Sequence, residues 1–596
     1  MAHFRRKFGF GSKDEAHDVS DRHLSVPGAV ITKGNLDYVV DQGGNNSLPS
    51  YQEASGAPVE TSSPLGLDVG PVTIIFLNIS KMVGTGVYST PASILKNTGS
   101  VGLSLIYWLL GFLNAGSSLA MYLEYASYFP NRSGSEVVYL EQAYPRPKYF
   151  WPTTFALQTV LLSFSSSNAI VMAQYLYRIN GTSPSAWSLK GVAIACYTVA
   201  FLFVVFHTKY SYWLSNSIGI VKVVTLVFVA ITGLVVLGGH TRVKNPLANF
   251  HDSFAGTTDS GYGLVNAMVK IIFSYQGYEN AFNVVNEVRN PVKSLKINAS
   301  ISLLIVAILY MLANIAFFAA VPKVELEKSS QVAASLFFQH VFGSGGAAKG
   351  LNFLIALSAF GNLLVVLIGQ SRLIRECGRQ GVLPWTSFWV STKPFGTPLG
   401  PYLLKWSLTL LMILAPPAGD AFNFVVDLAN YPAAFFYFLM ATGIYVVRYR
   451  RKQLHLPRSE FRAWDVAIVS TLVVNLFLLI GPWYPPIGGA TGGDVSFWYA
   501  TYVATSIGIL LACGVYYYLW IHAIPRWRGY RIRHETVVLN GGEVTHQLVK
   551  VKLSKLKEWD RTHNAAGAEL KSQNTQDDSS GIIESTVEDK QLSKAT

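Results

Sequence analysis

Two glycine-containing segments carry the residues most suited to binding chemistry, because each interrupts a long apolar stretch. The first is Ser80-Lys81-Met82-Val83-Gly84-Thr85-Gly86-Val87-Tyr88, and the second is Phe273-Ser274-Tyr275-Gln276-Gly277-Tyr278-Glu279-Asn280. A helix that unwinds at such a point frees backbone NH and CO groups, which at membrane depth must be satisfied by protein, water or a ligand. A helix that resumes after Gly86 directs its NH groups and positive dipole end at the gap, which suits a carboxylate.

Nine residues at the two interruptions are candidate ligand-binding residues. They are Val83, Gly84, Thr85, Gly86, Phe273, Ser274, Tyr275, Gln276 and Gly277. Either glycine cluster alone would also fit close packing of two helices. The two interruptions lie five apolar blocks apart, however, and paired breaks at corresponding positions are typical of transporters built from inverted repeats, with the site near the membrane midplane.

Lys222 is the strongest candidate for ion coupling. It lies about eleven residues into the fifth apolar block, which is a depth of about 16 Å at the rise of a helix. A lysine at the membrane centre costs roughly 2.5 to 3.5 kcal/mol, and residues kept at that cost often belong to substrate pathways or proton relays. The alternative is a structural pair with a carboxylate on a neighbouring helix.

Four further polar residues in or beside apolar blocks have open roles. Glu124 lies at the end of a block. Lys270 either pairs with Asp427 or extends toward the membrane surface, and we favour a structural role for it. Asn362 either lines a cavity or forms a hydrogen bond between helices. No arrangement of His, Asp or Glu resembles a metal site or a nucleophile with its base, and no Walker-type loop is present, so an enzyme or an ATP-driven pump is not expected.

The composition assigns these residues to a membrane protein. Hydrophobic residues make up 50% of the 596-residue chain and charged residues 14%, and the mean hydropathy is +0.31. The apolar residues form blocks of about twenty, which match a hydrocarbon layer of about 30 Å. We expect twelve transmembrane helices at residues 71–95, 101–125, 149–177, 189–207, 212–237, 263–285, 297–321, 347–374, 401–415, 422–447, 463–482 and 497–521.

The distribution of cations predicts the orientation of the chain. The net charge of +13 is concentrated in alternate short loops, as at Arg146, Arg379 and Arg450, rather than in a nucleic-acid-binding face. Both tails are therefore expected in the cytoplasm. We divide the chain into a largely disordered tail at residues 1–69, a transporter domain at 70–523, and a second tail at 524–596. That second tail should contain a short hairpin around Asn540-Gly541-Gly542 and a disordered end from about Asn564.

Several motifs resemble a known family. Met82-Val83-Gly84-Thr85-Gly86-Val87-Tyr88 resembles the first-helix motif of the amino acid, polyamine and organocation superfamily, and the segment from Phe273 to Asn280 resembles the sixth-helix motif of its L-type amino acid transporter branch. Similar loops are Pro130, Ser133, Gly134, Glu136, Tyr139 and Leu140; Glu287-Val288-Arg289-Asn290-Pro291-Val292-Lys293-Ser294-Leu295; and Arg379-Gln380-Gly381-Val382-Leu383-Pro384. Within this branch, residues 67–530 resemble the fungal methionine permeases, most particularly at Leu414-Ala415-Pro416-Pro417-Ala418-Gly419-Asp420-Ala421.

The resemblance implies an all-α fold with a five-plus-five inverted repeat, broken first and sixth helices and two additional C-terminal helices. It implies import of a neutral amino acid, methionine above all, across the plasma membrane, and a lysine at the position of Lys222 is similar to the family's replacement for a sodium ion, so proton coupling is expected. A facilitative exchanger and a nutrient sensor with the same fold remain alternatives. No cofactor is expected. A disulfide-linked partner subunit is not expected either, because the outer loop that contains the Asn180 glycosylation sequon has no cysteine.

Overall fold

The computed structural model describes residues 30–33, 36–41, 50–53, 70–130, 135–206, 208–288, 290–329, 332–391, 393, 395, 397–417, 419–538, 544–563, 567 and 569. The predictions for the remainder of both tails, for Ser133, Gly134, Arg289 and Ala418, and for the turn at Asn540-Gly541-Gly542 lie outside these residues.

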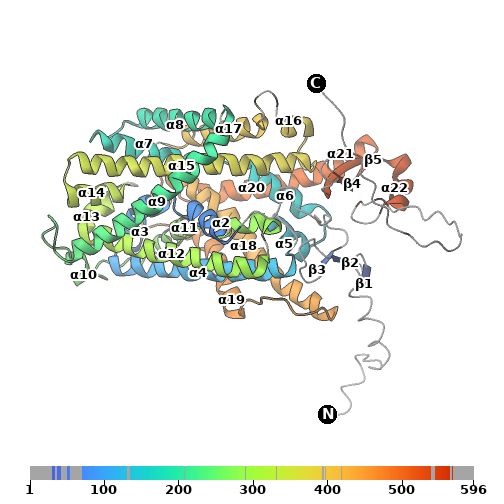
Figure 1. Cartoon of the computed structure of the whole chain (residues 1–596), viewed down its shortest axis with the longest axis horizontal. Coiled ribbons are helices and arrows are strands. Elements are labelled where there is room, and N and C mark those ends of the chain that lie inside the picture. The colour runs from blue at the N-terminus through green and yellow to red at the C-terminus, as the bar shows by residue number, and fades with distance from the viewer. Residues whose placement is uncertain are drawn as a thin grey trace, which may run out of the picture.

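Long apolar helices form most of the molecule and run roughly along its long axis (Figure 1). Within the described residues, nine helical segments are long and apolar enough to cross a membrane. Six are single helices or part of one: Val101–Tyr128 (α4), Ala186–Phe206 (α8), Asn216–Leu237 (within α9, Thr208–Leu237), Pro291–Ala320 (α12), Gly346–Arg379 (α15) and Ala421–Gln453 (α18). Three are composite: Phe150–Ile179 consists of α6 (Phe150–Leu161) and α7 (Ser166–Ile179); Asp465–Trp483 consists of α19 (Asp465–Ile480) and η2 (Gly481–Trp483); and Thr501–Arg528 consists of α20 (Thr501–Tyr517), η4 (Tyr518–Ala523) and α21 (Ile524–Arg528). A tenth candidate is the bent pair α2 (Pro71–Met82) and α3 (Gly86–Thr98), which meet at 45°.

The other two predicted spans correspond to shorter helices. They are α11 (Gly261–Tyr275), with 15 residues, and α17 (Leu399–Leu414), with 16 residues. Both are shorter than the approximately 20 residues of a typical crossing helix. After α11 the chain turns and continues as a 3-10 helix, η1 (Asn280–Glu287), rather than as a second α-helix.

The third predicted span contains a break that the hydropathy pattern does not show. Helix α6 ends at Leu161 and α7 begins at Ser166. In the gap, the Ser163 hydroxyl donates to the Val160 carbonyl at 2.7 Å, and the Ser165 amide donates to Thr409 Oγ1 at 3.1 Å. These bonds compete with the regular helical pattern, and serine side chains commonly do this near helix ends.

Shorter elements lie at the two ends of the bundle (Figure 1). One end carries α10 (Ala248–His251), α13 (Lys323–Lys328) and α14 (Ala333–Phe342). The opposite end carries α5 (Glu136–Ala143), α16 (Thr386–Val390), β1 (Val30–Lys33), β2 (Leu36–Asp41), β3 (Ser50–Glu53), β4 (Tyr530–Val538), β5 (Val544–Lys552) and α22 (Leu556–Thr562). Two further 3-10 turns are η3 (Gly489–Thr491) and η5 (Leu553–Lys555).

The strands form two antiparallel sheets, one from the chain before the helical bundle and one from the chain after it. In the first, β2 lies between β1 and β3, although we expected residues 1–69 to be largely disordered. In the second, β4 pairs with β5 and Tyr530 lies opposite Lys552, at the place where a hairpin was predicted. The Leu548 amide donates to the Gln380 carbonyl at 2.8 Å, so this hairpin is attached to the chain directly after α15.

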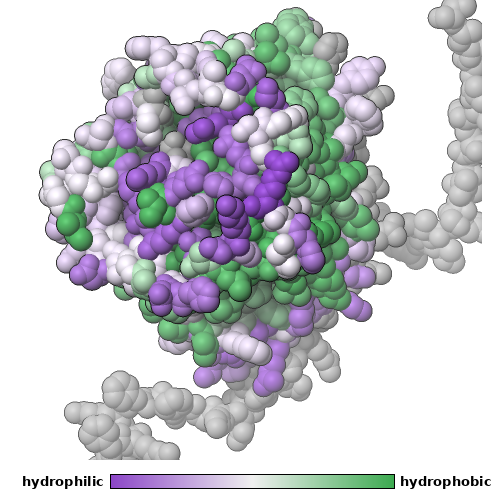
Figure 2. All heavy atoms as spheres, turned by 90° about the vertical axis from the view of Figure 1, so that its left-hand side faces the viewer, coloured by the Kyte–Doolittle hydropathy of each residue, from purple (hydrophilic) through white to green (hydrophobic). Residues whose placement is uncertain are grey.

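The surface separates into polar ends and an apolar flank. Figure 2 looks onto the end that carries α10, α13 and α14, where hydrophilic residues predominate, while hydrophobic residues cover the flank visible beside it. Large apolar side chains are exposed on the helices, including Leu113 on α4, Val224 and Ile231 on α9, and Leu304 and Ile308 on α12. Such a surface is stable against lipid rather than water, so the described chain has the architecture of an α-helical membrane protein.

Candidate functional site

The break between α2 and α3 leaves three backbone amides free. The Val83 amide donates to the Ile79 carbonyl and the Gly84 amide to the Met82 carbonyl, both at 2.8 Å. The amides of Thr85, Gly86 and Val87 have no hydrogen-bond acceptor within the described residues. The free donors are therefore at the first turn of α3, slightly later than the predicted run from Val83 to Gly86, because α2 extends its hydrogen bonding through Val83.

The end of α11 supplies acceptors opposite these donors. Gly277 has φ +126°, so the chain leaves the helix here, and its amide donates to Glu279 Oε2 at 2.9 Å instead of to Phe273. Within the described chain, the Phe273 and Tyr275 carbonyl oxygens accept no hydrogen bond. A β-carbon at Gly277 would lie 2.8 Å from the Met82 amide nitrogen, so glycine permits the two breaks to approach each other.

Direct contacts join the two breaks. The Tyr310 hydroxyl, from α12, lies 2.6 Å from the Met82 carbonyl oxygen and 3.1 Å from the Ser274 carbonyl oxygen. Thr90 Oγ1 and Ser274 Oγ are 2.9 Å apart. A β-carbon built at Gly86 would lie only 3.0 Å from the Ser274 Cα atom. The structure thus brings together the residues that the sequence analysis selected from segments almost 190 positions apart.

An ionic contact connects the breaks on the side facing α5. Lys81 Nζ lies 2.9 Å from Glu279 Oε1, and the lysine side chain is 36% exposed while the glutamate is 9% exposed. Nearby on α5, Glu136 accepts a hydrogen bond of 2.5 Å from the Tyr122 hydroxyl. Burial raises the pKa of the Glu136 carboxyl above its ordinary value, although the bond from Tyr122 opposes this shift.

The predicted pocket side chains point to two different neighbours. The Phe273 ring packs at right angles to Phe422 of α18, with 6.1 Å between centroids, and Gln276 Nε2 donates to Asn430 Oδ1 of α18 at 2.9 Å. Tyr275 instead points to α4, where its hydroxyl donates to the Trp108 carbonyl at 3.1 Å. Phe273 and Gln276 therefore remain candidates for contacts with a ligand side chain, whereas Tyr275 contributes its free carbonyl.

Lys222 is buried beside the first break. Its Nζ atom lies 3.5 Å from the Ser80 carbonyl oxygen and donates a short hydrogen bond to Asn362 of α15. No carboxylate among the described residues forms an ion pair with it, so the alternative of a structural ion pair has no support in this part of the chain. A β-carbon at Gly84 would overlap the Asn362 amide, which links the break directly to the partner of Lys222.

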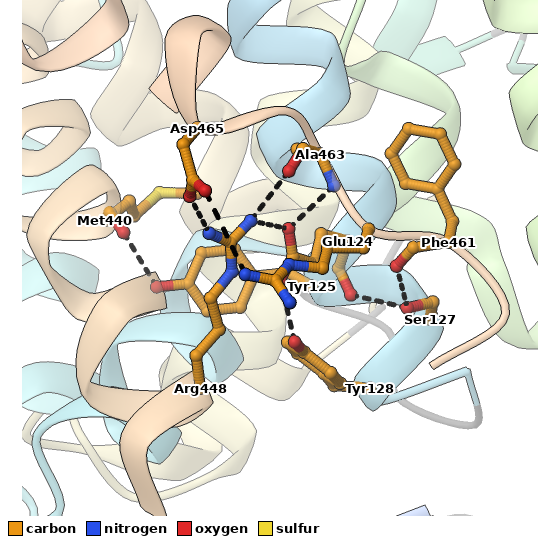
Figure 3. Close-up of polar contacts among 10 residues, drawn as sticks. Glu124, Tyr125, Ser127, Tyr128, Met440, Arg448, Phe461, Ala463 and Asp465 are labelled. Carbon is orange, nitrogen blue, oxygen red and sulfur yellow. Dashed lines mark hydrogen bonds and ion pairs between the residues drawn. The ribbon is translucent and has the colours of Figure 1, made fainter. Parts of the chain in front are cut away.

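The other buried ionisable residues are paired. Lys270 Nζ lies 2.5 Å from Asp427 Oδ1, and both side chains are nearly inaccessible, so the pairing alternative for Lys270 is correct. Figure 3 shows Glu124 of α4 facing Arg448 of α18, with Nη2 to Oε2 at 2.6 Å. The Ala463 amide also donates to Glu124 at 2.8 Å, so this carboxylate joins α4, α18 and the segment before α19.

Several residues at the site were not found from the sequence. Tyr310 bridges the breaks, Asn168 of α7 accepts a hydrogen bond of 3.0 Å from the Thr85 hydroxyl, and Asn430 holds Gln276. None of them belongs to a motif with a spacing signal, because Tyr310 stands among apolar residues, Asn168 follows a run of serines, and Asn430 lies one turn after Asp427. Among the described residues no group of three or more His, Cys, Asp or Glu side chains could hold a metal ion, and all three cysteines are free.

The fold and the paired breaks define an integral-membrane transporter class, and comparisons with known proteins agree. Residues 69–512 match the family model described as amino acid permease. The chain belongs to this family, which confirms the resemblance drawn from the motifs. Its family and relatives are transporters rather than enzymes, and the chain is a multi-pass membrane protein of the amino acid permease type.

Two of the relatives are yeast permeases. The chain is 35% identical over 486 residues to the high-affinity methionine permease of Saccharomyces cerevisiae, covering 81% of this chain and 84% of that protein. It is 27% identical over 520 residues to the low-affinity methionine permease of the same yeast, covering 85% and 93% of the two chains. The b(0,+)-type amino acid transporter 1 of Mus musculus is 26% identical over 431 residues, covering 71% and 83%.

Proposed function

We propose that this protein is a secondary active transporter that imports a neutral amino acid, methionine above all, together with protons. The observation that carries the proposal is the pair of facing helix ends, one with free amides and the other with free carbonyls. The carboxylate binds the amides of Thr85, Gly86 and Val87, where the start of α3 supplies donors and a positive dipole end. The ammonium binds the carbonyls of Phe273 and Tyr275.

The proposed specificity rests on the side chains facing α18. Phe273 offers an aromatic face to a thioether, a contact worth about 0.3 to 1.5 kcal/mol. Gln276 and Asn430 form the polar part of the same wall. The two yeast relatives are both methionine permeases, which supports methionine as the ligand in this position.

Proton coupling is assigned to Lys222. Its ammonium has a neutral amide and a carbonyl of the first break as acceptors, with no carboxylate among its hydrogen-bond partners in the described chain, so loss of its proton does not break an ion pair. In its protonated form Lys222 holds the Ser80 carbonyl, and thereby α2, more strongly than the neutral amine does, because hydrogen bonds from an ionised donor are the stronger ones, so deprotonation loosens that helix. The protonation state of Lys222 then shifts the equilibrium between the outward-open and the inward-open site.

The proposed topology has the twelve transmembrane spans that the sequence predicts. Twelve spans arise when α2 with α3, α11 with η1, and α17 are counted together with the nine long segments, and the two breaks then occupy the first and sixth positions of a five-plus-five inverted repeat. The end with α16 and β4–β5 carries Arg379, which ends α15 beside the hairpin, and Arg451, which packs over the Tyr51 ring of β3, and these cations support a cytoplasmic position for both tails. The transporter acts in the plasma membrane without a disulfide-linked partner.

Radiolabelled methionine uptake tests the proposed function in cells that lack their own methionine permeases. We expect accumulation above the external concentration, its loss when a protonophore removes the proton gradient, and strongest competition from methionine among neutral amino acids. Uptake that only equilibrates, or that requires an internal amino acid, would identify an exchanger instead. Binding without flux at normal surface expression would identify a sensor.

Lys222→Met separates coupling from substrate binding, because methionine keeps much of the side-chain volume and removes the charge. Accumulation against a gradient should fail, while exchange at equal concentrations across the membrane should continue. Lys190→Met is the matched control, since Lys190 also donates to a backbone carbonyl, that of Leu414, but is only half-buried and forms this bond at an exposed position. Undiminished proton-driven accumulation by Lys222→Met at normal surface levels would refute the coupling role.

A further inference from the structure

A second lysine, Lys405 of α17, is completely buried and surrounded by neutral acceptors. Its Nζ atom donates to the Ser163 carbonyl at 2.6 Å and to the side-chain oxygen of Gln370 on α15. Within the described chain, no aspartate or glutamate forms an ion pair with Lys405. It therefore differs from Lys270, which is equally buried but lies against Asp427.

The arrangement around Lys405 repeats that around Lys222. Each lysine donates to a side-chain amide of α15, Asn362 or Gln370, and each also reaches a backbone carbonyl at a helix break. For Lys405 the break is the gap between α6 and α7, which contains Ser163. Asn362 and Gln370 are eight residues apart, or about 12 Å along the helix, so the two lysines mark successive depths of α15.

We propose that Lys405 is a second proton-exchange site, through which the proton passes between Lys222 and the cytoplasm. This inference rests on the proposed proton coupling. Gln370 lies on the part of α15 that leads to Arg379 and the β4–β5 hairpin, the end assigned to the cytoplasm. A neutral amine has two N–H donors, which satisfy Ser163 and Gln370, and the ammonium adds a third. The proton can thus leave to cytoplasmic water, giving the amine, and return without the loss of either hydrogen bond.

The charges around Lys405 agree with this role. Helix α17 packs against α7, α8, α15, α16 and α18. Helices α7, α8, α16 and α17 contain no acidic residue, and on α8 the Tyr197 hydroxyl faces Thr409 and Ser165.

Helices α15 and α18 carry charged residues, but the carboxylates Glu376 and Asp427 form ion pairs with residues other than Lys405. Beyond Gln370, α15 carries Arg372, Arg375 and Glu376, and Glu376 binds Arg379 with Nε to Oε2 at 2.8 Å. On α18, Asp427 binds Lys270. The surroundings thus place cations on the helices around Lys405 but no carboxylate that pairs with it, and burial together with like charges favours release of its proton.

Two substitutions distinguish proton exchange from a structural contact. Gln370→Glu places a carboxylate beside Lys405, and an opposite charge at this distance strengthens proton binding by about tenfold to a thousandfold. Lys405→Arg keeps the donors but cannot lose its proton. For both variants we expect net proton-driven accumulation to fall by about tenfold or more, with exchange at equal concentrations within about twofold of wild type. Net uptake should also lose its dependence on internal pH.

The measurement uses the full-length protein in permease-deficient cells, with internal pH clamped, surface protein quantified, and Lys190→Met as control. A structural contact would be kept or strengthened in Gln370→Glu, so wild-type accumulation in both variants would overturn the proposal. Equal loss of exchange and accumulation would also overturn it, because that result indicates a distorted fold. If the wild-type protein shows no proton-driven accumulation, the proposed function itself fails, whereas failure of the Lys405 inference alone leaves the Lys222→Met result intact.

Discussion

Gly86→Ala tests the closeness of the two breaks with a single methyl group. The added β-carbon would lie 3.0 Å from both Cα and Oγ of Ser274 and 3.2 Å from its Cβ atom, inside ordinary van der Waals contact. The start of α3 would have to move away from α11, and overpacking of this kind typically costs about 1 to 3 kcal/mol. If the site must close around the ligand, that cost weakens the apparent affinity by about 5-fold to 150-fold.

Initial rates of labelled methionine uptake over a range of concentrations, corrected for surface protein, would measure this effect. Gly116→Ala on α4 is the matched control, because nothing lies within 4 Å of its added carbon and alanine favours a helix. The control should transport normally. An affinity for Gly86→Ala within about twofold of wild type, at normal surface level, would show that the contact between α3 and α11 does not shape the site.

Further substitutions probe three other parts of the molecule. Tyr310→Phe removes the hydroxyl between the two breaks and should weaken affinity by about 5-fold to 30-fold, from about 1 to 2 kcal/mol, so an unchanged affinity would contradict its bridging role. Gln276→Ala and Asn430→Ala should alter the ranking of competing amino acids in the same way, and an untouched ranking would remove Gln276 from the pocket. Arg448→Met leaves Glu124 buried without its cation, at a cost of about 3 to 5 kcal/mol, so thermal unfolding in detergent should occur at lower temperature and Glu124→Gln in the same chain should restore part of the loss. Equal stability of the single variant and wild type would exclude this structural role.

Local sequence patterns were sufficient to locate the nine long apolar segments, the bent pair α2 and α3, and the end of α11. Apolar blocks of about twenty residues mark lipid-embedded helices because the backbone must satisfy its own hydrogen bonds there. Gly84, Gly86 and Gly277 mark the breaks because glycine permits close approach of two backbones and, at Gly277, a positive φ. These signals are local, so they can be recognised in the sequence without knowledge of the tertiary structure.

The partners of these segments could not be predicted in the same way. The Ser163 gap lies within a continuous apolar block, and the bond from Ser165 to Thr409 that accompanies it joins residues 244 positions apart. Lys405 resembles any lysine near a helix end until Gln370 and the Ser163 carbonyl are placed beside it. Tyr310 likewise acquires its role only when two distant carbonyls meet at its hydroxyl.

The most direct test of the proposed binding site is a cryo-electron microscopy map of the full-length protein with methionine bound. We predict ligand density between the start of α3 and the end of α11, with the carboxylate at the amides of Thr85, Gly86 and Val87 and the ammonium at the carbonyls of Phe273 and Tyr275. Methionine density elsewhere in the bundle, or in this gap with its carboxylate turned away from α3, would contradict it.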